Sequence, residues 1–235
     1  MQRNQPAQQT ERATAHERNP VVKLRPRLVL LMGTTILLLS CYAPRRMEQP
    51  APQASQRAPE PFSAARYDAE ILGYLNELRR DPPAFYKKYV RAYIAEKRER
   101  FTARYTASLQ HTLSRLGPLP AFSMDPTINR LAGKQLHYLV VQLKGARLSH
   151  DQGRISFADR IKGTGLHCFA ENLYRFPKSS PLEVVLDLLI DQGVSSLGHR
   201  KNMLNPKYTR IGIQSAVAPN GYKVTVMDFG CTPAS

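Results

Sequence analysis

Four polar residues of this chain have side chains that could share one chemical site: His150, Glu171, Asp191 and His199. Neutral imidazoles bind Zn²⁺ and similar ions at about 2.0–2.1 Å, and carboxylates either bind the ion or orient an imidazole through its second nitrogen. Two histidines and two acids therefore predict an open site for a divalent cation. A water bound there could become a nucleophile as its pKa falls towards about 7, and without metal an oriented histidine could act as a general base.

Each of these residues also has a simpler interpretation. His150 follows a serine in a predicted loop and could be an ordinary surface residue, Glu171 could satisfy backbone donors, and His199 could cap a helix. Neither histidine lies in a spacing such as His-Glu-x-x-His, so the sequence leaves open whether the protein is an enzyme. The remaining histidines match no motif.

Short motifs surround these residues. They are Leu148-Ser149-His150, Ala170-Glu171-Asn172-Leu173, Ser196–Leu204, Tyr208–Ile213, Leu75-Asn76-Glu77-Leu78-Arg79 and Met227-Asp228-Phe229-Gly230. Their order and spacing resemble the CAP superfamily of cysteine-rich secretory proteins, insect venom antigens and plant pathogenesis-related proteins. The resemblance covers residues 66–230, apart from a basic insertion at 84–116 that is longer than in many bacterial members.

The resemblance implies a three-layer α-β-α sandwich around a small central antiparallel sheet, with a cleft lined by two histidines and two acids. His150 matches the first family histidine, Glu171 the glutamate of Glu-Asn-Leu, and His199 the histidine of Gly-His. Asp191 is inferred from register alone, because Leu188-Leu189-Ile190-Asp191 stands where relatives carry Trp-x-x-Glu. Aspartate is one methylene shorter than glutamate, so we expect Asp191 to reach His199 only through a water.

The elements that must position these residues follow from periodicity. Apolar residues at helical spacing, capping residues and prolines predict helices from about 64 to 80, from 126 to Gly145 and from 181 to 190. Two apolar runs around Pro219-Asn220-Gly221 predict a β-hairpin of strands 211–217 and 222–229. Helices first and strands last favour the α+β class.

The first 63 residues are interpreted as export and tethering segments. An apolar run at 28–39 follows Lys23, Arg25 and Arg27, is too short to span a bilayer, and ends at Ser40-Cys41. This resembles a lipoprotein signal in which Cys41 is lipidated. The alternatives are a single-pass anchor or an ordinary secretory signal. Residues 42–63, rich in Pro, Gln and Ala, predict a disordered tether, and 64–235 one globular domain.

The charge predicts an anionic neighbour. The chain carries +16 overall, and 28 basic and 16 acidic groups, a net +12, remain beyond residue 41. We expect a membrane partner through lipidated Cys41 and the basic surface, a lipid, sterol or anionic glycan as ligand, and a monomer that does not bind nucleic acid. The absence of an aspartate after Cys41 points to the outer membrane if the source is a diderm bacterium. The basic insertion is either a solvated helical face or a membrane or glycan contact.

Three hypotheses of function remain open. The favoured one is an extracytoplasmic, lipid-anchored binding module whose cleft takes a divalent cation, a lipid or an envelope ligand. The second is a metal-assisted, peptidase-like hydrolase, and the third a structural or defensive surface protein with an unused cleft. Cys168 and Cys231 could form a disulfide in an oxidising compartment or be two buried thiols.

Overall fold

The structure is a computed structural model that describes residues 61–162, 164–166 and 168–231. The chain divides into two units, residues 1–55 and 56–235, and the described residues belong to the second. The predicted signal peptide, the lipidation site at Cys41 and the tether up to residue 60 lie outside them. Among the described residues, no helix is long and apolar enough to cross a membrane.

Helix α1 (Ala64–Arg80) begins and ends as its sequence predicts. The Ser63 hydroxyl accepts a hydrogen bond from the Arg66 amide and caps the first turn, and the helix ends before Asp81. Ile71, Leu75 and Leu78 form its buried stripe.

The basic insertion folds into a series of short helices. These are α2 (Pro82–Phe85), the π-helical turn η1 (Tyr86–Val90), α3 (Arg91–Glu96), the 3₁₀ turn η2 (Arg98–Arg100) and α4 (Ala103–Arg115). Phe85, Val90, Leu109 and Leu113 are buried in the main hydrophobic core. The insertion is therefore an integral part of the domain.

Helix α5 (Pro126–His137) starts where Asp125 accepts hydrogen bonds from the amides of Thr127 and Ile128 at 2.8 and 3.0 Å. It continues as the π-helical turn η3 (Tyr138–Gln142), so the predicted end at Gly145 was slightly too late. The short helix α6 (Phe157–Ile161) was not predicted.

In the described part of the chain, the sheet has four strands in the order β1-β3-β4-β2: β1 (Ser123–Met124), β2 (Phe169–Phe176), β3 (Tyr208–Val217) and β4 (Lys223–Cys231). The β3–β4 hairpin confirms the prediction, with Gly221 at a positive φ of 80°. The expected antiparallel sheet is right for the three long strands and wrong for β1, which pairs in parallel with β3. We had not predicted β2.

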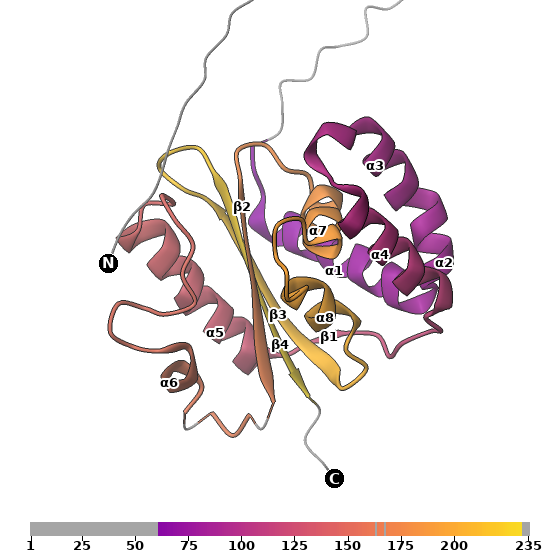
Figure 1. The fold of residues 1–235 in the computed structure, drawn as a ribbon. Helices are drawn as coiled ribbons and strands as arrows, with labels where there is room; N and C mark the ends of the chain where they lie inside the picture. Colours follow the sequence, from indigo (N-terminus) through magenta and orange to yellow (C-terminus); the bar gives the residue numbers. More distant parts are fainter. Residues whose placement is uncertain (1–60, 163, 167, 232–235) are drawn as a thin grey trace, which may run out of the picture. The chain divides into compact units, whose positions relative to one another are not determined.

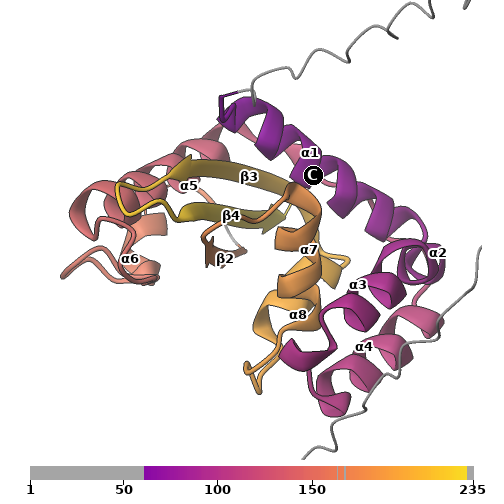
Figure 2. The same cartoon turned by 90° about the horizontal axis from the view of Figure 1, so that it is seen from above.

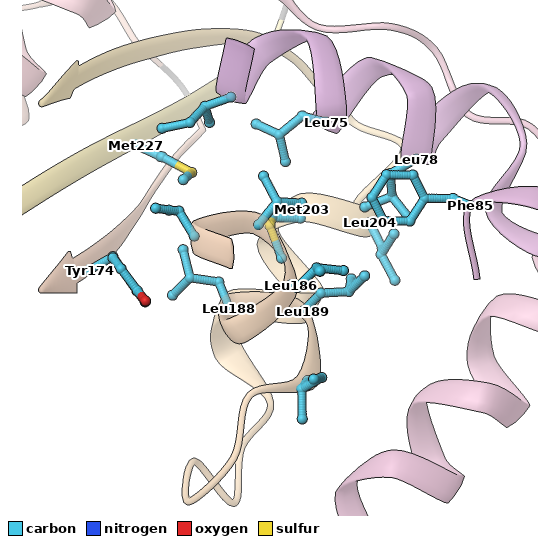
Figure 3. Close-up of a cluster of buried hydrophobic side chains, with 14 of the residues drawn as sticks. Leu75, Leu78, Phe85, Tyr174, Leu186, Leu188, Leu189, Met203, Leu204 and Met227 are labelled. Atoms are coloured by element: carbon cyan, nitrogen blue, oxygen red, sulfur yellow. The ribbon is translucent and has the colours of Figure 1, made fainter. Parts of the chain in front are cut away.

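Helices cover both faces of this sheet, which confirms the expected three layers. Figures 1 and 2 show α5 and α6 on one face, and α1, α7 (Pro181–Ile190) and α8 (Gly198–Leu204) on the other, with α2–α4 beside α1 and α7. The larger hydrophobic cluster packs α1, α7 and α8 against the sheet and includes Leu75, Leu186, Met203 and Met227 (Figure 3). A smaller cluster joins α5 and η3 to the opposite face.

A disulfide joins Cys168 to Cys231, whose Cα atoms are 5.7 Å apart. It links the residue before β2 to the last residue of β4, beside the Phe169–Gly230 pair of the ladder. The two neighbouring strands are therefore covalently tied at one end.

Candidate functional site

The first histidine–acid pair joins a loop to strand β2. The Nδ1 atom of His150 lies 2.8 Å from Glu171 Oε1. The side chain of His150 is 53% exposed, whereas that of Glu171 is completely buried. The carboxylate thus fixes the ring through Nδ1 and leaves Nε2 without a hydrogen-bond partner among the described residues.

Arg160, on α6, holds this pair together. Its Nη1 donates to the His150 carbonyl oxygen at 2.7 Å and to Glu171 Oε1 at 3.1 Å, and its Nη2 donates to Glu171 Oε2 at 2.7 Å. The guanidinium side chain is only 4% exposed. A buried carboxylate needs such a partner, and a bidentate arginine also fixes the carboxylate plane.

Asp228 lies beside this pair, directly opposite Glu171 in the β2–β4 ladder. Its carboxyl is buried, and neither of its oxygens accepts a hydrogen bond from a described residue. Burial and the charge of Glu171 raise the pKa of Asp228 well above its usual range, against the opposing effect of Arg160. The protonated form of Asp228 is therefore favoured, and its O–H can donate to Glu171.

The second pair joins α8 to the end of α7. His199 Nδ1 lies 2.7 Å from Asp191 Oδ1, and the Arg200 amide donates to Asp191 Oδ2 at 3.2 Å. Our expectation of a bridging water was wrong. Asp191 adopts a left-handed backbone, φ 60°, immediately after α7, and Leu197 does so before α8, φ 54°. These two turns bring α8 back against Asp191, so the short acid reaches the ring directly.

Arg200 connects this second pair to the insertion. Its guanidinium donates to the carbonyl oxygens of Leu189 and Ile190 at the end of α7, at 2.7 and 2.8 Å, and to Ser108 Oγ on α4 at 2.9 Å. Burial lowers the pKa of Arg200, and the charge of Asp191 opposes this effect. The insertion therefore supports the turn that carries Asp191.

The two pairs approach strand β2 from opposite faces. Successive side chains of a strand alternate, so Glu171 and Asn172 point to different sides. Glu171 binds His150, whereas Asn172 donates to the His199 carbonyl oxygen at 3.1 Å and accepts from Asn202 at 2.8 Å. Asn202 thus holds the side chain of Asn172, which in turn binds the backbone of His199.

This arrangement bears on the predicted metal site. In residues 61–162, 164–166 and 168–231, no group of three or more His, Cys, Asp or Glu side chains could hold a metal ion. Both carboxylates are turned to an imidazole Nδ1, which is the orienting role rather than the ligand role. The metal site formed by His150, Glu171, Asp191 and His199 stays a prediction.

A cleft of about 330 Å³ lies against the second pair. Its lining consists of Arg100, Phe101, Leu148, Leu173, Tyr174, Arg175, Phe176, Asp187, Leu188, Asp191, Gln192, Val194 and His199. We expected all four site residues to share one cleft. Of the four, Asp191 and His199 alone line this cleft, because Glu171 turns its side chain to the other face of β2. Leu148, from the loop of His150, also reaches it.

Asp187 organises the far end of the cleft. It accepts hydrogen bonds from the hydroxyls of Tyr93 and Tyr174, each at 2.7 Å, and from Arg100 Nη2 at 2.9 Å. Burial and Asp187 raise the pKa of both tyrosines, which therefore remain neutral donors. Arg100 and Phe101 belong to the insertion, so part of its inner side forms a wall of the cleft.

Sequence comparison now decides the family. The model of the cysteine-rich secretory protein family, CAP, matches residues 72–229. The chain belongs to the CAP family. No curated protein matches the sequence significantly.

Solved structures of CAP proteins are similar at low identity. An outer surface protein from Borrelia burgdorferi is 19% identical, with 55% of this chain and 89% of that chain covered and a TM-score of 0.39. An extracellular SCP-domain protein from Bacillus anthracis is 15% identical, with 74% and 45% covered and a TM-score of 0.43. The CAP domain of enterococcal PrgA is 14% identical, with 74% and 67% covered and a TM-score of 0.41.

Three residues of the candidate site were not singled out from the sequence. Asp187 lies outside the motifs, and Asp228 stands in the motif Met227–Gly230 but was given no role there. Both are acids in apolar stretches, of α7 and β4, and that contrast could have marked them as buried and paired. No pattern in the sequence identifies Arg160, which comes from a short helix in an irregular segment.

Proposed function

We propose that this CAP domain is a binding module and that the cleft beside His199 is its ligand site. The supporting observation is a cleft of about 330 Å³ with a mostly apolar wall and a few convergent polar groups, which is typical of ligand sites. Leu148 and Phe176, which are 37% and 41% exposed, both line it. Exposed apolar side chains in a cleft favour a ligand with an apolar part, and His199 Nε2 can bond its polar group.

The lining of the cleft favours binding over nucleophilic catalysis. It contains no serine, threonine, cysteine or lysine among the described residues. Asp187 already accepts three hydrogen bonds, and Asp191 is bonded to His199 and the Arg200 amide. A hydrolase here would have to use a water activated by His199, for which the Asp191–His199 pair is the one favourable feature.

The experiment fills the cleft. Val194→Trp places a large side chain in the lining, and Val141→Trp, at a 50% exposed position on η3, is the matched control. A library of small amphipathic fragments is screened by ligand-observed NMR against the full chain and both variants. Fragments should bind wild type and Val141→Trp but not Val194→Trp; equal binding to all three proteins contradicts the proposal. A hydrolase screen with His199→Ala tests the second candidate.

We place this domain outside the cytoplasm, tethered by a lipid on Cys41. The support is the leader sequence, together with exposed cations of the insertion such as Lys87, Arg91 and Arg104. One acyl chain with basic charge binds an anionic membrane better than either alone. Intact mass after membrane extraction should show the acyl groups, and Cys41→Ser should leave the membrane fraction. Retention of Cys41→Ser at high salt would exclude lipid anchoring.

A further inference from the structure

Strand β2 is an edge of the sheet, and its outer side has no backbone partner. It pairs with β4 on one side, and among the described residues no backbone hydrogen bond joins residues 169–176 to any other segment. In an edge strand every second residue directs its N–H and C=O away from the sheet. Such a row of unpaired groups can pair with another extended chain.

The cleft runs along this edge. Leu173, Tyr174, Arg175 and Phe176, the last four residues of β2, all line it. Four successive residues of one strand, which belong alternately to its two faces, border a single cleft where the cleft follows the strand's edge. At about 3.3 Å per residue, this stretch offers roughly 13 Å of strand.

The walls above this edge suit the side chains of an extended segment. Leu148 and Val194 are apolar contacts contributed by two separate loops. Phe101 and Phe176 lie near Arg100, whose guanidinium is 5.4 and 5.0 Å from their ring centroids. A segment with alternating side chains could bury one set here while its backbone pairs with β2.

The charged side chains of the cleft indicate which charge a bound segment should carry. Arg175 donates to the Gly145 carbonyl oxygen at 2.8 Å and lies 4.2 Å from the Tyr222 ring centroid, but forms no ion pair with a described carboxylate. The two acids of the lining, Asp187 and Asp191, are already bonded. The positive charge of Arg175 is thus left for a carboxylate brought by the ligand.

We infer that the cleft binds an extended acidic segment of another polypeptide as an added strand on the free edge of β2. This inference rests on the proposed function, because it names the ligand class of the same cleft. Backbone pairing with β2 supplies the affinity, and Arg175 together with the apolar walls supplies the preference for acidic and apolar side chains.

The test starts from a displayed library of linear ten-residue peptides selected on the full chain. Selected peptides should contain acidic residues next to apolar ones. Each peptide is then N-methylated at one position at a time, which removes a single N–H donor. We expect a loss of affinity of tenfold or more at every second position of a stretch of about four residues, and little change between them. No enrichment, or affinities indifferent to N-methylation, overturns the inference.

Matched variants locate the binding. Arg175→Gln should weaken acidic peptides several-fold more than their amide counterparts, and Val194→Trp should abolish binding while Val141→Trp keeps it. Hydrogen exchange should slow at alternate amides of 173–176 when peptide binds, and not at β1, the other edge. If the protein alone is a dimer with these amides protected, the edge is used by a second copy and the inference is wrong.

The outcomes also separate this inference from the proposed function. If amphipathic fragments bind wild type and Val141→Trp but not Val194→Trp, and no peptide binds, the cleft is a ligand site but does not accept an added strand. If neither fragments nor peptides distinguish Val194→Trp from Val141→Trp, both fail.

Discussion

Replacing Arg160 with methionine removes the cation that compensates the buried carboxylate of Glu171. Glu171, whose side chain is 0% exposed, would lose two hydrogen bonds to Nη1 and Nη2, and Asp228 would lose a guanidinium 4.0 Å away. Methionine keeps much of the volume, so the main effect is electrostatic. Removing one partner of a buried ion pair costs about 3–5 kcal/mol, and we expect Arg160→Met to lower the free energy of unfolding at pH 7 by this amount.

The assay is urea unfolding followed by circular dichroism at pH 7, with Arg154→Met as control. Arg154 is an exposed arginine of the neighbouring loop, and its replacement should change stability by less than about 0.5 kcal/mol. A deficit below about 1 kcal/mol at pH 7 would refute the reasoning.

Three further predictions concern the fold and the site. Burial raises the pKa of Asp68 from 3.8 to about 6, so its contribution to stability is present below about pH 4 and lost as the pH rises through 6. The free energy of unfolding of Asp68→Asn should therefore rise relative to that of wild type by up to about 3 kcal/mol as the pH increases, measured by urea titrations from pH 4 to 8. A Cβ at Gly212 would collide with the backbone of Ile128 and Asn129 on α5, so Gly212→Ala should cost about 1–3 kcal/mol in thermal unfolding, whereas Gly117→Ala, with nothing within 4 Å, should not. If a cation site exists, calorimetric zinc titration should show binding that is lost in the His150→Ala/His199→Ala double variant; no heat with wild type would make the metal prediction wrong.

The elements that the sequence predicted are those specified by neighbouring residues. Helix α7 has a capping box formed by Ser180 and Glu183 with Pro181 at its start, and the β3–β4 turn has Asn220-Gly221. Strand β2 escaped prediction because it carries adjacent polar residues, Glu171 and Asn172, which break the alternation of a half-buried strand. That break is where the strand contacts both histidine segments.

The candidate site was predictable in its residue types but not in its geometry. Family register placed His150, Glu171, Asp191 and His199 in one site; in the structure His150 lies beside Glu171 and His199 beside Asp191. Sequence could not show that the pairs lie on opposite faces of a strand, since that depends on the register of β2. It also could not show Arg160, whose contact with Glu171 depends on how an irregular segment folds over the sheet.

The register of β2 is therefore the condition on which the whole site depends. A shift by one residue would send Glu171 to the α8 side and Asn172 to the Arg160 side, because side chains alternate with a period of two. Three features oppose such a shift. Leu173 is buried in the cluster with α5, Tyr174 in the cluster with α7, and the Cys168–Cys231 disulfide ties the start of β2 to the end of β4. The disulfide thus helps to hold the register on which both histidine pairs depend.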